Sequence, residues 1–204
     1  MDVTRALEDL DEVRSRLAAV QRFRGLSAAA ALASAVGAAA AGAAQSILAP
    51  RPEGAREVGL YVTIWIACLA FALAVNYGAI LVWALRHWSR RSQSELRTVG
   101  MTILPAIVAG GAFTAAVIAR GEYGLLPGVW CTCYALGLLA SRAMAPRGVT
   151  PVALGFGAAG AALLFAHGDG ALAWWVMPLT FGTGQAIVAG LIARDAEASR
   201  GAIA

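Results

Sequence analysis

Six long stretches of this 204-residue chain contain no Asp, Glu, Lys or Arg, and short polar segments separate them. Each stretch is close to the roughly 20 apolar residues that an α-helix needs to cross a bilayer. The pattern predicts an all-α, polytopic membrane bundle of six transmembrane helices. The predicted spans are approximately residues 25–49, 58–85, 98–119, 123–141, 148–168 and 170–193, with a short tail at 195–204.

The segment before the first span, residues 1–24, has the pattern of an amphipathic helix. Apolar residues recur at alternating steps of three and four, as in a heptad stripe, and the opposite face carries acidic residues and arginine. We expect this helix to lie on its own bundle or on the membrane, or to dock a partner protein or a second copy of the chain. The residues of the docking stripe are Leu10, Val13, Leu17 and Val20.

Arginine is distributed unevenly between the two sides of the predicted bundle. Thirteen of the 16 basic residues lie in the N-terminal arm, the second and fourth connections and the tail, whereas three lie in the other connections. The positive-inside rule therefore places both termini in the cytoplasm, and the N-terminal helix with them. This topology accounts for the pI near 9.4 without a nucleic-acid partner.

Composition also predicts how the spans pack. The first span has 13 alanines and three glycines among its 25 residues, which favours a place inside the bundle, where small residues let backbones approach. The second and fourth spans are expected to face lipid. Tyr61 and Trp65 are expected in an interfacial aromatic belt. Pro105 and Pro178 lie about two turns into their predicted spans, where a kink is expected.

Residues that carry chemistry are scarce inside the spans. Asp, Glu, Arg and His stay in the connections or at span ends, and the chain has no lysine. Proton-coupled transport, ion pumping and voltage sensing rely on intramembrane ionisable residues, so they are disfavoured, and a retinal Schiff base is excluded. The G-x-G-x-x-G run at 155–160 lies in mid-helix rather than after a strand, so we interpret it as helix packing. We expect a non-enzymatic protein with no cofactor.

Metal binding is a minor alternative. His167 and Asp169 are the best candidate ligands for a divalent cation at the outer rim, but arginines among the acidic residues there favour ordinary solvated ion pairs. The cysteines Cys68, Cys131 and Cys133 fall inside spans and are interpreted as small packing residues. No metal site is therefore predicted.

Two polar amides are predicted to lie at similar depth inside the bundle. Asn76 precedes Arg86 by ten residues, and Gln185 precedes Arg194 by nine, in spans that run in the same direction. An amide exposed to hydrocarbon is costly, so each is expected to face protein. The pair is either a structural clasp or a polar lining for a solute path or ligand pocket.

A basic cluster follows the second span, in a connection of about a dozen residues. Each arginine near anionic lipid contributes on the order of 1 kcal/mol, so membrane lipids are one predicted partner, and the connection is large enough for a cytoplasmic protein. Its residues are Arg86, His87, Arg90, Arg91 and Arg97.

Three motifs resemble a set of uncharacterised bacterial six-span membrane proteins. They are residues 22–27 (RFRGLS), 124–130 (GLLPGVW) and the end of the sixth span, 181–194, and they cover about 25 residues. Members of this set are often encoded beside winged-helix transcriptional regulators, which implies a role in gene regulation or stress response. They tend to carry a histidine near the position of Gln185, which argues against a ligand role for that amide here.

The leading functional hypothesis is a non-enzymatic integral membrane protein, a sensor-like or accessory subunit that acts through partners. It rests on the heptad stripe, the charge asymmetry and the lack of catalytic groups. The alternative is a channel or carrier for a small neutral or apolar solute, and a weaker one is an intramembrane lipid-modifying enzyme. The sequence leaves homo-oligomer formation open.

Overall fold

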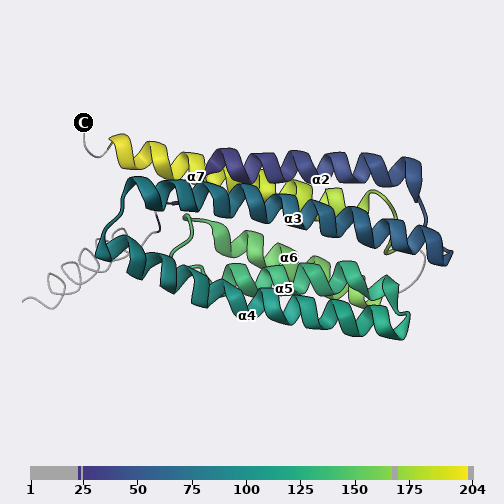
Figure 1. The fold of residues 1–204 in the computed structure, drawn as a ribbon. Coiled ribbons are helices and arrows are strands. Elements are labelled where there is room, and N and C mark those ends of the chain that lie inside the picture. Colours follow the sequence, from purple (N-terminus) through teal and green to yellow (C-terminus); the bar gives the residue numbers. More distant parts are fainter. Residues whose placement is uncertain (1–22, 24, 167–169, 202–204) are drawn as a thin grey trace, which may run out of the picture.

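The computed structural model describes residues 23, 25–166 and 170–201, and this part of the chain is helical without a strand (Figure 1). A 3₁₀ turn, η1 (Tyr123–Leu125), and a π-helical turn, η2 (Pro178–Gly182), precede two of the helices. The α-helices are α2 (Ala28–Leu48), α3 (Ala55–Arg86), α4 (Arg90–Arg120), α5 (Leu126–Ala140), α6 (Val149–Phe165) and α7 (Thr183–Gly201).

Four helical segments are long and apolar enough to cross a membrane, so the protein is built as a membrane-embedded helix bundle. They are Ala28–Leu48, Ala55–Arg86, Leu96–Arg120 and Tyr123–Ala140. The 17-residue helix α6 is apolar but shorter. The N-terminal stripe residues Leu10, Val13, Leu17 and Val20, and the metal candidates His167 and Asp169, lie outside the described residues.

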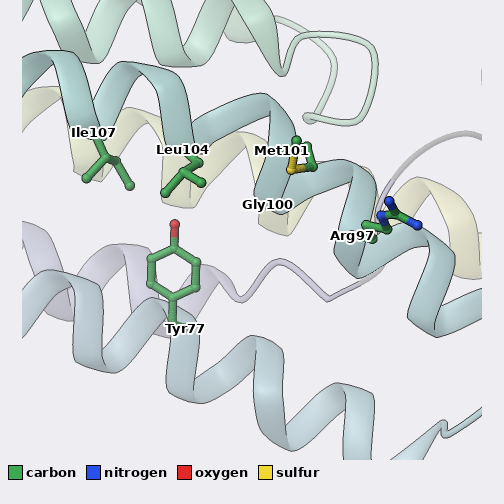
Figure 2. A pocket seen from close by; sticks show the side chains of 6 residues that line it. All are labelled: Tyr77, Arg97, Gly100, Met101, Leu104 and Ile107. Atoms are coloured by element: carbon green, nitrogen blue, oxygen red, sulfur yellow. The ribbon is translucent and has the colours of Figure 1, made fainter.

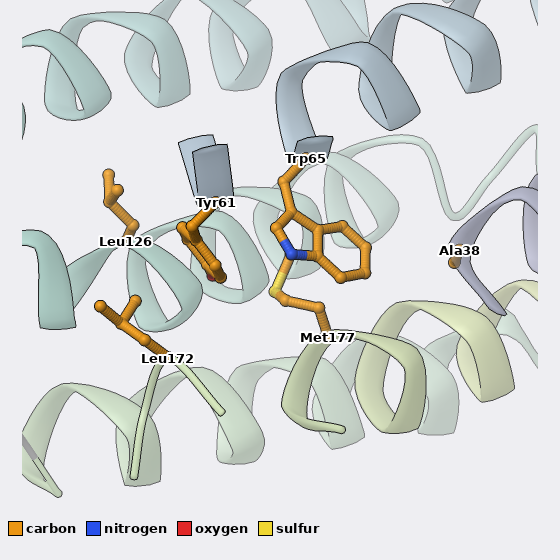
Figure 3. Packing of buried hydrophobic residues seen from close by; sticks show 6 residues of the cluster. All are labelled: Ala38, Tyr61, Trp65, Leu126, Leu172 and Met177. Carbon is orange, nitrogen blue, oxygen red and sulfur yellow. The ribbon is translucent and has the colours of Figure 1, made fainter. Parts of the chain in front are cut away.

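The helices are arranged in two groups of three. Helix α2 packs against α3 and α7, and α5 packs against α4 and α6, while α3 touches α4 only sparsely (Figure 1). The principal core lies between the groups. Figure 3 shows Tyr61 and Trp65 projecting from α3 toward Leu172 and Met177.

Local sequence explains several helix ends. The Ser27 side chain accepts a hydrogen bond from the Ala30 N–H at 3.3 Å and so caps the first turn of α2. Helix α4 ends at Arg120 and is followed by Gly121, whose φ of 73° is in the left-handed region. The Gly121 N–H donates to Ile118 and the Glu122 N–H to Val117, which is the Schellman pattern that satisfies the last carbonyls of a helix.

Two helices begin at residues that differ from the starts of the predicted spans. The basic connection after the second span is only three residues long, because α3 continues to Arg86 and α4 already begins at Arg90. Residues 90–97 are polar but contain no Gly or Pro, so nothing prevents them from extending the helix beyond the apolar window. The last helix starts later than predicted: residues 170–175 form a turn, and helical structure begins at Val176.

Several predicted orientations are also wrong. Tyr61 is 0% exposed and Trp65 4% exposed, so both belong to the core rather than to an interfacial belt. The fourth span was predicted to face lipid, but its helix α5 packs between α4 and α6. The least buried of the four candidate spans is instead the one in α4. Aromatic residues suit both a core and an interface, and only the rotation of the helix decides between them.

Small residues bring the helices together, as predicted for the first span. Pro178 is the third residue of its helical segment, and its ring lies against Gly42 of α2. Pro178 is the first residue of the π-helical turn η2, whereas a kink about two turns into the sixth span was predicted. In the G-x-G-x-x-G run, Gly160 lies against the α5 backbone at Gly128 and Thr132, which fits the packing interpretation of that motif.

Candidate functional site

The two amides singled out from the sequence are bonded to different partners. Asn76 Nδ2 donates to Ser34 Oγ and to the Ala72 carbonyl, each at 2.8 Å. Gln185 Nε2 donates to the Tyr134 hydroxyl at 2.7 Å. The structure therefore does not form the predicted Asn76–Gln185 clasp. Asn76 joins α3 to α2, and Gln185 joins α7 to α5, because each amide finds a hydroxyl on the helix beside it.

Two further polar bridges were not predicted. Trp65 Nε1 donates to Gln45 Oε1 at 2.8 Å, and Gln45 Nε2 donates to the Leu172 carbonyl at 2.7 Å. Trp130 Nε1 donates to Thr114 Oγ1 at 2.8 Å, joining α5 to α4. For Gln45 a signal was available in the sequence, because a single amide in an alanine-rich span must find a buried partner.

Several hydroxyl groups in the described bundle donate to carbonyl oxygens of their own helix, as Thr114 does to Gly110 and Thr180 to Val176. Two buried hydroxyls in the described residues, Tyr61 Oη and Thr132 Oγ1, have no hydrogen-bond partner. They lie on α3 and α5 among apolar and small neighbours. The amides Gln45, Asn76 and Gln185, in contrast, connect different segments of the bundle.

An open groove lies between α3 and α4 (Figure 2). Its volume is about 530 Å³. Arg97 lies at one end and is the only charged side chain of the lining, and the rest is largely apolar. The residues that line the groove are Tyr77, Arg97, Gly100, Met101, Leu104 and Ile107.

The sparse contact between α3 and α4 creates this groove. The helices are joined by only three residues, yet they pack lightly along their length. A Cβ atom placed on Gly100 would meet no atom within 4 Å, so the glycine leaves open space on α4. Figure 2 shows Tyr77 projecting from α3 toward Leu104, so its ring forms a wall of the groove.

The predicted basic cluster is divided among different structural positions. Arg86 ends α3, and Arg90 and Arg91 are the first residues of α4. His87 stacks on Trp83 with ring centroids 5.5 Å apart, and its Nδ1 lies 3.0 Å from the Trp83 carbonyl oxygen. Among Arg86, His87 and Arg97, the members of the cluster whose side chains the structure describes, Arg97 lines the groove.

The end of the N-terminal arm is fixed to the same end of the bundle. Phe23 is buried, and its ring contacts Trp83 edge-on at a centroid distance of 5.1 Å. The Phe23 N–H donates to the Met144 carbonyl at 3.1 Å. The arm therefore joins the bundle beside the α3–α4 turn and the α5–α6 connection.

The described residues contain no group of three or more His, Cys, Asp or Glu side chains positioned to hold a metal ion. No protein-family model, curated protein or solved structure matches this chain. Its function is therefore inferred from its own residues and their arrangement.

Proposed function

We propose that this chain is a six-span, non-enzymatic protein of a bacterial inner membrane, with both ends in the cytoplasm, that acts through a partner on its cytoplasmic side. The proposal rests on the hydrogen bonds that polar side chains inside the bundle make to one another. Ser34–Asn76 and Tyr134–Gln185 are hydrogen-bonded across neighbouring helices, so these groups stabilise the bundle instead of lining a path or a reaction centre.

The packing of the last two helices supports six spans. Helix α6 lies along α5, and α7 lies along α2, so both share the layer occupied by the four candidate spans (Figure 1). At 1.5 Å per residue the 17 residues of α6 extend about 25 Å, near the lower limit for crossing hydrocarbon. Helical structure from residue 176 to 201 is long enough for the sixth span.

Charge supports the orientation. Thirteen of the 16 basic residues belong to the end of the bundle that carries the N-terminal arm, the α3–α4 and α5–α6 connections and the C-terminal segment. Such a bias places that end in the cytoplasm. Buried Phe23 fixes the arm at this end, so a partner bound to the stripe at Leu10, Val13, Leu17 and Val20 would lie close to the bundle.

The experiment compares partners captured from detergent extracts by the full chain and by a chain without residues 2–22. We expect the partner set to lose its specific member when the arm is removed. A matched pair sharpens the comparison: Leu10→Ser with Leu17→Ser alters the stripe, whereas Glu8→Ser with Glu12→Ser alters the opposite face. An unchanged partner set for the deletion and for the stripe variant would overturn the proposal. A role in transcriptional or stress regulation rests only on the resemblance of three sequence motifs.

A further inference from the structure

We propose that the groove between α3 and α4 binds one anionic glycerophospholipid, with its phosphate at Arg97 and an acyl chain along Met101, Leu104 and Ile107. The site rests on the proposed function only in requiring α3 and α4 to lie in the bilayer. The phospholipid would come from the leaflet next to the α3–α4 turn, which is the cytoplasmic leaflet in the proposed orientation.

The length of the groove fits half of a bilayer. Arg97 and Ile107 are ten residues apart on α4, which is about 15 Å along a helix. The hydrocarbon core is about 30 Å thick, so one leaflet contributes about 15 Å. If the Arg97 guanidinium lies at the headgroup level, the apolar lining from Gly100 to Ile107 extends about 10 Å along the helix, which covers about two thirds of the depth of one leaflet.

The shape of the groove favours a chain rather than a protein side chain. Gly100 contributes no side chain, and Tyr77 from α3 faces Leu104 at the middle of the lining (Figure 2). The result is an apolar trough with walls from two helices. Apart from the Tyr77 hydroxyl and the Arg97 guanidinium, the lining is apolar, so an acyl chain would contact mainly apolar side chains.

Charge favours an anionic headgroup. Arg97 is exposed, and none of the described acidic side chains forms an ion pair with it. A guanidinium binds phosphate oxygens through two parallel N–H donors. Among the residues that the structure describes, the lining contains no carboxylate to receive the ammonium group of a zwitterionic lipid. A phospholipid with a net negative charge is therefore preferred over a zwitterionic one.

Native mass spectrometry of the full chain in detergent tests the site. The probes are phosphatidylglycerol and phosphatidylcholine with identical acyl chains, added separately. We expect one phosphatidylglycerol to bind in preference, and Arg97→Gln to weaken that binding about fivefold, the effect of one arginine near anionic lipid. Arg142→Gln is the charge control, since Arg142 is also exposed but lies beyond α5.

A second pair of variants tests the apolar trough. Gly100→Leu fills open space in the groove and should weaken the binding of phosphatidylglycerol several-fold. Gly111→Leu also enters open space on α4 but lies outside the lining, and it should have no such effect. Size-exclusion profiles verify that all four variants are folded.

The inference is overturned if the two phospholipids bind equally, if Arg97→Gln weakens binding no more than Arg142→Gln, or if Gly100→Leu leaves binding unchanged. Because the measurement is made in detergent, it does not depend on the direction in which the helices cross the membrane. An unchanged partner set in the arm-deletion experiment, which would overturn the proposed function, would also leave the lipid measurement unaffected. Failure of this inference is thus distinguishable from failure of the proposed function.

Discussion

The indole nitrogen of Trp65 donates a hydrogen bond to Gln45 Oε1 at 2.8 Å, and both side chains are buried. The same amide donates through Nε2 to the Leu172 carbonyl at 2.7 Å. One side chain therefore joins α2, α3 and the turn that precedes the last helix. Because this amide has no water around it, its hydrogen bonds should be important for the stability of the bundle.

Replacing Gln45 by leucine should lower the stability of the bundle. The change leaves the Trp65 N–H and the Leu172 carbonyl without partners, and each unsatisfied buried group costs about 1–3 kcal/mol. Equilibrium unfolding in mixed micelles measures the difference in free energy of unfolding. Ser46→Ala is the control, because Ser46 is a half-buried neighbour whose hydroxyl donates to Ala43 within α2, and we expect a change within about 0.5 kcal/mol. Equal effects of the two variants would contradict a buried bridge at Gln45.

Gly160→Ala should separate α5 from α6. A Cβ atom at this position would lie 2.9 Å from the Thr132 backbone nitrogen and 3.0 Å from the Gly128 carbonyl oxygen. Backbone atoms cannot move as a side chain can, so we expect a loss of about 1–3 kcal/mol in the free energy of unfolding. Gly155→Ala, in the same helix, meets no atom within 4 Å and should leave stability unchanged or raise it slightly.

Double-mutant cycles distinguish the observed polar pairs from the predicted amide clasp. Ser34→Ala with Asn76→Ala, and Tyr134→Phe with Gln185→Ala, should each give a coupling energy of roughly 0.6–1.7 kcal/mol, as for hydrogen bonds between membrane helices. Asn76→Ala with Gln185→Ala should be additive within about 0.5 kcal/mol. A coupling energy for Asn76 and Gln185 as large as that of either observed pair would contradict the observed pairing and support a direct hydrogen bond between the two amides.

The protein should not conduct small solutes. The amides that would line a solute path are hydrogen-bonded to side chains of adjacent helices. In liposomes tested with glycerol and urea by stopped-flow light scattering, we expect swelling rates equal to those of protein-free liposomes. A faster rate that Asn76→Leu abolishes would favour the channel or carrier alternative instead.

The charge-free windows correctly predict the helical class and four helices long and apolar enough to cross a membrane in the described residues, because a segment that crosses a bilayer must be almost free of charge. It does less well where the pattern is ambiguous. Residues 90–97 are polar and were interpreted as a loop, but Arg, Gln, Glu and Leu are also good helix formers. Tyr61 and Trp65 were assigned to the interface, although aromatic side chains fit equally in a core.

The candidate groove depends on features that local sequence does not encode. Arg97, Leu104 and Ile107 share a face of α4 because of the helical period, but that this face is left open follows from the sparse packing of α3 against α4. Similarly, the depths of Asn76 and Gln185 were comparable in sequence, whereas their partners depend on which helices are neighbours. Depth can be counted along the chain, but adjacency is a tertiary property.

The central claim is that six helices cross the bilayer with both ends in the cytoplasm, and cysteine labelling at two glycines tests it most directly. Gly170 and Gly201 are exposed, and a Cβ atom on either meets no atom within 4 Å. In a background without the three native cysteines, Gly170→Cys and Gly201→Cys are treated with a membrane-impermeant maleimide in bacterial spheroplasts. The account predicts that Gly170→Cys is labelled in intact spheroplasts and Gly201→Cys only after lysis. Labelling of Gly170→Cys only after lysis would show that the last two helices do not cross, and labelling of Gly201→Cys before lysis would contradict the orientation.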